Sequence, residues 1–109
     1  MNAPSPGLVT RLSPDLTGRQ RQHLRGLGHH LQPVVLVGQR GISENLMENV
    51  SSALLSHELI KVKVHDSDDM PEVAQHIHDH TSAQLVQKIG KVMLFFKAHP
   101  DEPKIKLPG

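Results

Sequence analysis

The chain has 109 residues, a length typical of one domain whose hydrophobic core needs no metal or disulfide to stabilise it. It contains no cysteine, which excludes a disulfide framework and a cysteine-based zinc site and agrees with a reducing compartment. No apolar run approaches the roughly 20 residues of a membrane span, and the N-terminus lacks a signal-peptide core. We therefore expect a cytoplasmic protein with no membrane partner.

The formal net charge is only +1, but the charged residues are distributed unevenly. Residues 1–40 contain five basic residues and one acid, residues 41–80 contain eight acids and two lysines, and residues 81–109 contain five lysines and two acids. If the two basic ends fold together, they form one positive face on a nearly neutral molecule. Such a face predicts a polyanionic partner.

Residues 1–15 contain three prolines and little apolar periodicity, so we interpret them as a flexible tail. Thr17 and Gln20 have the spacing of a capping box, which predicts a helix from here to about residue 30. Leucines three and four residues apart would line its buried face: Leu24, Leu27 and Leu31. The basic stripe beside them is either part of a binding surface or an ordinary solvated helix side: Arg21, Arg25 and His29.

Pro33 opens an apolar run, residues 34–37, that predicts a buried strand. Two glycines then bracket Gln39 and Arg40, and glycine accepts positive φ and lets another backbone approach closely. Ser43 is a suitable N-cap for a following helix. A strand, a tight loop with one arginine and a helix N-terminus together suit a phosphate. The alternative is that the glycines only permit a sharp strand-to-helix turn.

The remaining elements follow from apolar spacing. We predict a helix to about residue 57, an alternating strand over residues 59–65 and a third helix with Pro71 in its first turn. Its inner face would be Met70, Val73, Ala74 and Ile77. The strand–helix–strand order predicts a parallel pair of strands.

Residues 83–89 and 92–96 are strand-like and flank a two-residue turn, which predicts a hairpin. Because strands that are apolar throughout are buried on both faces, runs 34–37 and 92–96 should be central, with the alternating strand outside them. We divide the chain into a domain over residues 16–99 and a C-terminal tail, residues 100–109, in which Ile105 and Leu107 can dock.

Signatures of catalysis are scarce. Residues 38–41 are followed by no Lys-Ser/Thr pair and lack the three-glycine dinucleotide spacing, and no serine lies in an elbow motif. We therefore predict a non-catalytic protein without a cofactor.

His76 and His80 are one helical turn apart and could share a zinc ion. No further ligand is fixed by spacing. The favoured interpretation is therefore a polar helix face that includes His78, and no metal is predicted.

The Gly-x-x-Gly loop and its basic surroundings suit RNA, because K-homology domains clamp the sugar-phosphate backbone with such a loop. The only aromatic residues are Phe95 and Phe96, which favours recognition of backbone and shape over stacking of bases.

Five segments resemble, in order and spacing, the bacterial single-domain YhbY-like proteins of the CRM (chloroplast RNA splicing and ribosome maturation) family. They are residues 17–31, Pro33-Val-Val-Leu-Val-Gly-Gln-Arg-Gly, His57-Glu-Leu-Ile-Lys-Val-Lys-Val, Ile89-Gly-Lys and Lys104-Ile-Lys-Leu-Pro. The resemblance implies an α/β fold of order α-β-α-β-α-β-β with a four-stranded mixed sheet, similar to the C-terminal domain of translation initiation factor three. It also implies RNA binding and a role in assembly of the large ribosomal subunit.

The family's RNA-binding positions fall on the loop, the first helix and the lysines of the alternating strand: Gly38, Gln39, Arg40, Gly41, Arg21, Arg25, Lys61 and Lys63. Phe96-Lys97 departs from the family's Tyr-Arg, and Lys97 cannot make arginine's bidentate phosphate contact, but we keep it as a candidate. The main hypothesis is a monomer that binds structured ribosomal RNA of a large-subunit precursor. The alternatives are an adaptor that binds a ribosomal protein through the acidic middle segment, and a histidine-dependent metal-binding protein.

Overall fold

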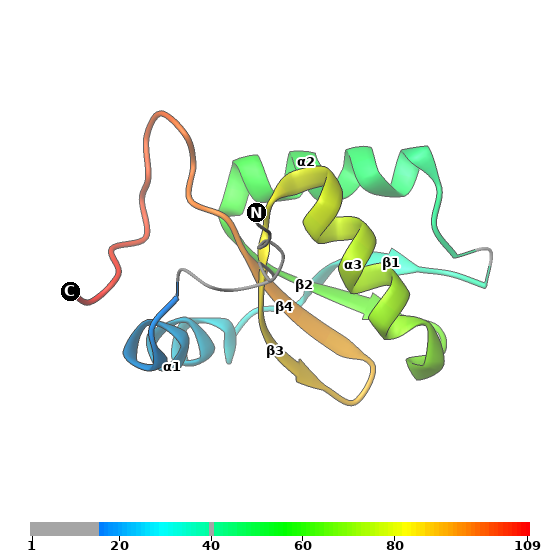
Figure 1. Cartoon of the computed structure of the whole chain (residues 1–109), viewed down its shortest axis with the longest axis horizontal. Coiled ribbons are helices and arrows are strands. Elements are labelled where there is room, and N and C mark those ends of the chain that lie inside the picture. The colour runs from blue at the N-terminus through cyan, green and yellow to red at the C-terminus, as the bar shows by residue number, and fades with distance from the viewer. Residues whose placement is uncertain (1–15, 40) are drawn as a thin grey trace, which may run out of the picture.

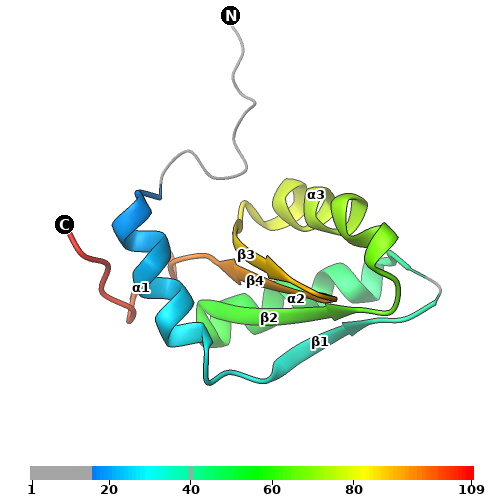
Figure 2. The ribbon, with the colours of Figure 1, turned by 90° about the horizontal axis from the view of Figure 1, so that it is seen from below.

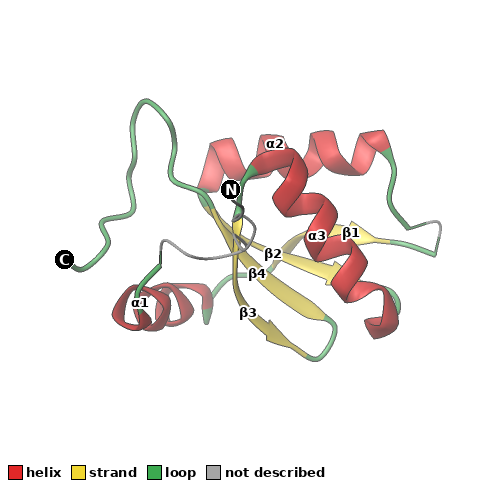
Figure 3. Ribbon diagram, in the orientation of Figure 1, coloured by secondary structure: helices red, strands yellow, loops and turns green. Residues whose placement is uncertain are grey.

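The computed structural model describes residues 16–39 and 41–109, so the predicted N-terminal tail lies outside the described residues. The elements are, in chain order, α1 (Gly18–Gly28), β1 (Pro33–Val37), α2 (Glu44–His57), β2 (Leu59–Val64), the 3-10 turn η1 (Ser67–Asp69), α3 (Met70–Thr81), β3 (Gln84–Ile89) and β4 (Val92–Phe96) (Figures 1 and 3). The predicted order of helices and strands is confirmed. None of the helices in the described part is long and apolar enough to cross a membrane.

The four strands form one mixed sheet in the order β1-β2-β4-β3. β1 and β2 are parallel across α2, as predicted, and β4 is antiparallel to both of its neighbours. The predicted hairpin joins β3 to β4 through Gly90 and Lys91, and Gly90 has a φ of 59°, which glycine adopts without steric cost.

The predicted positions of the strands within the sheet were partly wrong. β4 is central, but β1 is an edge strand and the alternating strand β2 lies beside it in the interior. Val34 is 52% exposed and Leu36 is 69% exposed, so an all-apolar run here does not mean burial on both faces. The lysines of β2 occur in a central strand because one face of the sheet is only partly covered and long side chains reach water from it.

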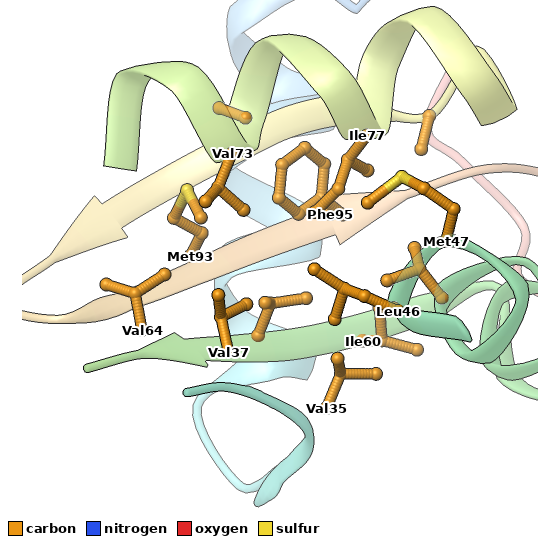
Figure 4. Close-up of a cluster of buried hydrophobic side chains, with 14 of the residues drawn as sticks. Val35, Val37, Leu46, Met47, Ile60, Val64, Val73, Ile77, Met93 and Phe95 are labelled. Atoms are coloured by element: carbon orange, nitrogen blue, oxygen red, sulfur yellow. The ribbon is translucent and has the colours of Figure 1, made fainter. Parts of the chain in front are cut away.

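Helices α2 and α3 cover one face of the sheet (Figure 1). Between them and the strands lies the main core, in which Phe95 and Met93 of β4 meet Val73 and Ile77 of α3 (Figure 4). The predicted inner face of α3 is confirmed, because each of its members is buried: Met70, Val73, Ala74 and Ile77. Helices α2 and α3 are thereby fixed on one side of the sheet.

Helix α1 crosses one end of the other face. Its capping box is formed as predicted, with Thr17 Oγ1 accepting from the Gln20 N–H and Gln20 Oε1 accepting from the Thr17 N–H. Leu24 is fully buried, but the helix ends earlier than predicted, at Gly28, and Leu27 is 42% exposed. The buried Gly28 lets α1 approach β4 closely, because an added Cβ would lie 2.8 Å from Leu94 Cδ2.

A second, smaller core lies beneath α1 and consists of Leu24, Leu59, Val86, Leu94 and Phe96. Ile105 and Leu107 of the C-terminal segment pack against it as partly buried side chains. Among the described residues, α1 and this segment cover one end of this sheet face, and no other described element covers the rest. We call the uncovered part the open sheet face and define it by Val34, Leu36, Lys61, Lys63 and Ile89.

Candidate nucleic-acid interface

The fold separates the charges by layer. α2, η1 and α3, which are described throughout, contain six acids (Glu44, Glu48, Asp68, Asp69, Glu72 and Asp79) and no lysine or arginine. We call these three elements the acidic layer. α1 contains three arginines and no acid, and the strands contain three lysines and no acid. Because α1 and the acidic layer lie on opposite faces of the sheet, the side of α1 carries positive charge on a nearly neutral molecule.

The two lysines of β2 lie side by side on the open sheet face. Successive side chains of a strand alternate between faces, and Ile60, Val62 and Val64 belong to the main core. Lys61 and Lys63 therefore project to the other face, where Lys61 is half-buried and Lys63 is exposed. Their neighbours across the sheet include the exposed Leu36, which pairs with Lys63.

Lys97 does not belong to this group. It follows β4 on the side of the acidic layer, where it lines a small pocket with Ser51, Leu54 and His80. The sheet therefore separates its side chain from Lys61 and Lys63. The sequence could not show this, because the face on which a strand residue lies depends on the register of the whole strand.

Arg21 is engaged within the protein. Its Nη1 donates hydrogen bonds to the backbone carbonyls of Leu85 at 2.9 Å and Val86 at 3.1 Å, and these bonds fasten α1 to β3. Arg25, one turn further along α1, is exposed and lines a groove beside the sheet. Of the two predicted arginines, Arg21 thus positions the helix, whereas Arg25 is available to a ligand.

Arg21→Ala should lower the free energy of unfolding by about 2 kcal/mol, because it removes two charge-assisted hydrogen bonds to carbonyls in the part-buried contact between helix and strand. Urea denaturation would measure the change. Arg19→Ala is the matched control, since Arg19 is exposed on the same helix and should change stability by less than about 0.5 kcal/mol. Equal urea midpoints for the two variants would show that Arg21 does not fasten the helix.

The groove lies between α1 and the open sheet face and encloses about 740 Å³. Arg25 of α1 and Lys61 of β2 supply its cationic groups, and His29, the residue that follows α1, also lines it. Apolar and amide side chains supply most of the rest: Leu31, Ile89, Val92, Leu94, Gln22, Gln32 and Gln87. All lining residues belong to the described chain and none is acidic, so the groove suits an anionic ligand.

The Gly-x-x-Gly loop lies at the other end of β1 from α1 (Figure 2). Gly38 and Gln39 are exposed, and Gly41 has a φ of 74°, a conformation that favours glycine. The Gly41 N–H donates to the Gly38 carbonyl at 3.0 Å, so this amide closes the turn and is not free for a phosphate. Arg40 lies outside the described residues.

His65 is a neighbour of the loop that sequence reasoning missed. Its ring Nε2 lies 3.4 Å from Gln39 Nε2, and its backbone N–H donates to the Val37 carbonyl at 2.9 Å. It continues the alternation of Lys61 and Lys63, and that continuation is the signal from which it could have been found. The open sheet face thus runs from the groove at α1, past the two lysines, to the loop.

Helix α2 starts as predicted, with Ser43 as N-cap. Its Oγ accepts from the Leu46 N–H at 3.1 Å, and Glu44 lies in the first turn. Glu44 is the acidic residue nearest to the loop in sequence, and it belongs to the acidic layer.

Glu58 is a buried acid at the C-cap of α2, and its role was not foreseen. Its carboxylate accepts backbone N–H groups from His99 at 2.7 Å, Ile105 at 2.9 Å and Lys104 at 3.0 Å. Burial of the carboxyl opposes ionisation, but these donors and the nearby His99 outweigh it and hold the pKa of Glu58 below its ordinary value of 4.5. The charged carboxylate therefore clamps the C-terminal segment to the domain.

The histidines of α3 do not belong to a three-ligand cluster in the described part of the chain. Among residues 16–39 and 41–109, no three His, Asp or Glu side chains gather in a way that could hold a metal ion. The His78 ring Nδ1 lies 3.0 Å from the Ala83 carbonyl, next to the end of the helix. The geometry therefore gives the metal-binding alternative no support.

Comparison with known proteins gives consistent matches. The CRS1/YhbY (CRM) domain model matches residues 16–97. The Bacillus subtilis "Probable RNA-binding protein YqeI" is 37% identical over 95 residues, which cover 85% of this chain and 99% of that protein. A Haemophilus influenzae "RNA-binding protein" is 40% identical over 95 residues, which cover 85% of this chain and 95% of that protein.

A solved structure agrees with the fold. The solution structure of the hypothetical protein SAV1595 from Staphylococcus aureus is 36% identical to this chain and superimposes with a TM-score of 0.72. The match covers 85% of this chain and 99% of the Staphylococcus aureus chain.

Proposed function

Since this chain belongs to the CRS1/YhbY (CRM) domain family, we propose that it is a non-catalytic RNA-binding protein. Its target is structured ribosomal RNA of a large-subunit precursor in the cytoplasm, where it assists assembly. The observation that carries the proposal is the separation of charge by layer, with the acid-free α1 and open sheet face on one side and the acidic layer on the other. A phosphate backbone would dock on the first side and be repelled by the second.

The interface follows the open sheet face. Arg25 and Lys61 would contact phosphates at the groove, and Lys63 would contact the next part of the same RNA. The loop residues Gly38, Gln39 and Arg40 would hold the backbone at the far end, and Gly41 would keep the turn of the loop closed. Arg21 would act by positioning α1, and the monomer would be the binding unit.

A second candidate function is supported by the acidic layer. Six acids unaccompanied by lysine or arginine suit a basic protein, and ribosomal particles contain many basic proteins. In this alternative, the protein reaches the particle as an adaptor through α2 and α3. The two functions predict contacts on opposite faces of the molecule, which makes them separable.

Site-specific crosslinking in cells tests both. A diazirine side chain at Leu36, on the open sheet face, should crosslink to RNA, and sequencing should map the crosslinks to large-subunit ribosomal RNA. Leu55 is the matched control, because it is 53% exposed on α2 in the acidic layer, against 69% for Leu36. Crosslinks from Leu55 to protein, with none from Leu36 to RNA, would replace the proposed function with the adaptor.

A further inference from the structure

We propose that the groove between α1 and the open sheet face binds one unpaired nucleotide of the bound RNA. The inference rests on the proposed function and adds a nucleotide site at the end of the interface remote from the Gly-x-x-Gly loop. The proposed nucleotide site and the Gly-x-x-Gly loop lie at opposite ends of β1 (Figure 2).

The floor of the groove is apolar and accessible. Among its lining residues, Leu94 is buried and Val92 is half-buried, whereas Ile89 of the edge strand β3 is 64% exposed. An exposed isoleucine on a sheet, beside a concave surface, provides contact area for a flat apolar partner such as a nucleobase. The two phenylalanines, the only aromatic residues of the chain, are both buried, so one base in the groove fits better than a stack of bases on an aromatic platform.

The rim carries groups that match the edges of a base. Three glutamines line the groove from three different segments: Gln22 of α1, Gln32 before β1 and Gln87 of β3. Each amide offers both a donor and an acceptor, as the hydrogen-bonding edges of bases do. Amides beside an apolar floor are typical of sites that fix the orientation of a small planar ligand.

The charged side chains of the groove favour an anionic ligand such as a nucleotide. Arg25 and Lys61 lie on the helix side and the sheet side of the groove, where they can contact the phosphates on either side of a bound base. All of the lining residues belong to the described part of the chain, and none of them is acidic. A cationic ligand is therefore disfavoured. The volume of about 740 Å³ falls in the range of small-ligand sites.

Base pairing decides which RNA fits. In a duplex, the faces of the bases are stacked and only their edges in the shallow minor groove are open to a protein. A nucleotide in a bulge or loop can turn out of the stack and enter the groove, while the flanking duplex lies along Lys63 and the loop. The groove therefore makes the protein prefer structured RNA that contains an unpaired nucleotide.

Binding to three hairpin RNAs with the same stem tests the inference. The first stem is fully paired, the second carries one bulged nucleotide, and the third carries an abasic residue at the bulge. We expect the wild-type chain to bind the bulged RNA about tenfold more tightly than either of the others, as expected for one buried base. The abasic RNA keeps the sugar-phosphate backbone and its charge at the bulge, so it isolates the contribution of the base.

Two variants locate the effect. Gln87→Ala and Ile89→Ser should each abolish most of the preference for the bulged RNA, while the dependence of affinity on salt stays unchanged because no charge is lost. Ile89 is exposed, so its replacement should leave the fold intact, as urea denaturation would verify. Gln75→Ala is the matched control, since Gln75 is exposed on α3 in the acidic layer and should keep the full preference.

The outcomes are distinguishable. Equal affinity of the wild-type chain for all three RNAs would overturn the nucleotide site and leave the proposed function standing. Displacement of the bulged RNA by a polyglutamate peptide, with no difference between the bulged and abasic RNAs, would also overturn it and assign the groove to an acidic protein segment. Failure to bind any of the RNAs at low salt would overturn the proposed function as well.

Discussion

Glu58→Ala is expected to lower the free energy of unfolding by about 3 kcal/mol, a large effect for one acid in a chain of this size. Glu58 is only 3% exposed, and its two carboxylate oxygens accept three backbone N–H groups of the C-terminal segment. Alanine removes all three bonds and leaves the donors partly buried without partners. Ile105 and Leu107 should then separate from the smaller core, which exposes Phe96 and Leu94.

The backbone of Glu58 adds a second effect. Its φ of 64° and ψ of −42° are unfavourable for any residue with a Cβ. Glu58→Gly should therefore lose less stability than Glu58→Ala, by up to about 1 kcal/mol, although both variants lack the carboxylate. Urea denaturation of the two variants separates the clamp from the backbone strain. Glu48→Ala, an exposed change on the same helix, should have little effect.

The clamp also makes stability depend on pH. Because the folded protein holds the pKa of Glu58 below its ordinary value of 4.5, its contribution is fully present above pH 4.5 and is lost as pH falls through the folded pKa. Glu58→Gln cannot lose a charge, so the gap in stability between wild type and this variant should shrink below pH 4.5. A constant gap between pH 7 and pH 3 would contradict the role of the ionised carboxylate.

Local patterns in the sequence predicted most of the fold. The capping box at Thr17 and the N-cap at Ser43 are formed by neighbouring residues, so the sequence alone can indicate them. The same holds for the apolar face of α3 and for the hairpin turn at Gly90. The order of strands was harder, because β1 is apolar throughout yet lies at an edge with Leu36 in water. The extent of the open sheet face depends on how far α1 and the C-terminal segment extend over the sheet.

The candidate site was less predictable because it depends on how distant parts of the chain pack together. The sequence indicated the unequal distribution of charge, but the layer in which each charge lies depends on strand register and helix placement. Arg21 could not be recognised as an anchor, because its partners are backbone carbonyls 64 and 65 residues away in sequence. Glu58 has partners 41 to 47 residues away, and a polar residue between a helix and a strand gave no sign of them. The groove combines residues from every strand and α1, so no local pattern contains it.

The double variant Lys61→Ala/Lys63→Ala is expected to weaken RNA binding by roughly 10- to 100-fold at 0.1 M salt. Both side chains lie on the open sheet face, next to each other on β2, where an RNA backbone that reaches from the groove to the loop must pass. Each phosphate contact releases counterions, so the slope of log affinity against log salt should fall by about 1.5 when two contacts are lost. Fluorescence anisotropy on one hairpin RNA at several salt concentrations measures both quantities.

Lys88→Ala/Lys97→Ala is the matched control, because it removes the same net charge from the other side of the sheet. Lys88 pairs with Met93 of the main core and so shares its face, and Lys97 lines a pocket with residues of the acidic layer. If RNA is attracted only by the net charge of the molecule, the two double variants should lose affinity equally, and their salt slopes should fall by the same amount. If RNA lies on the open sheet face, the control should keep the wild-type slope and nearly the wild-type affinity. Equal losses would therefore rule out a localised interface and leave only a diffuse attraction between protein and RNA.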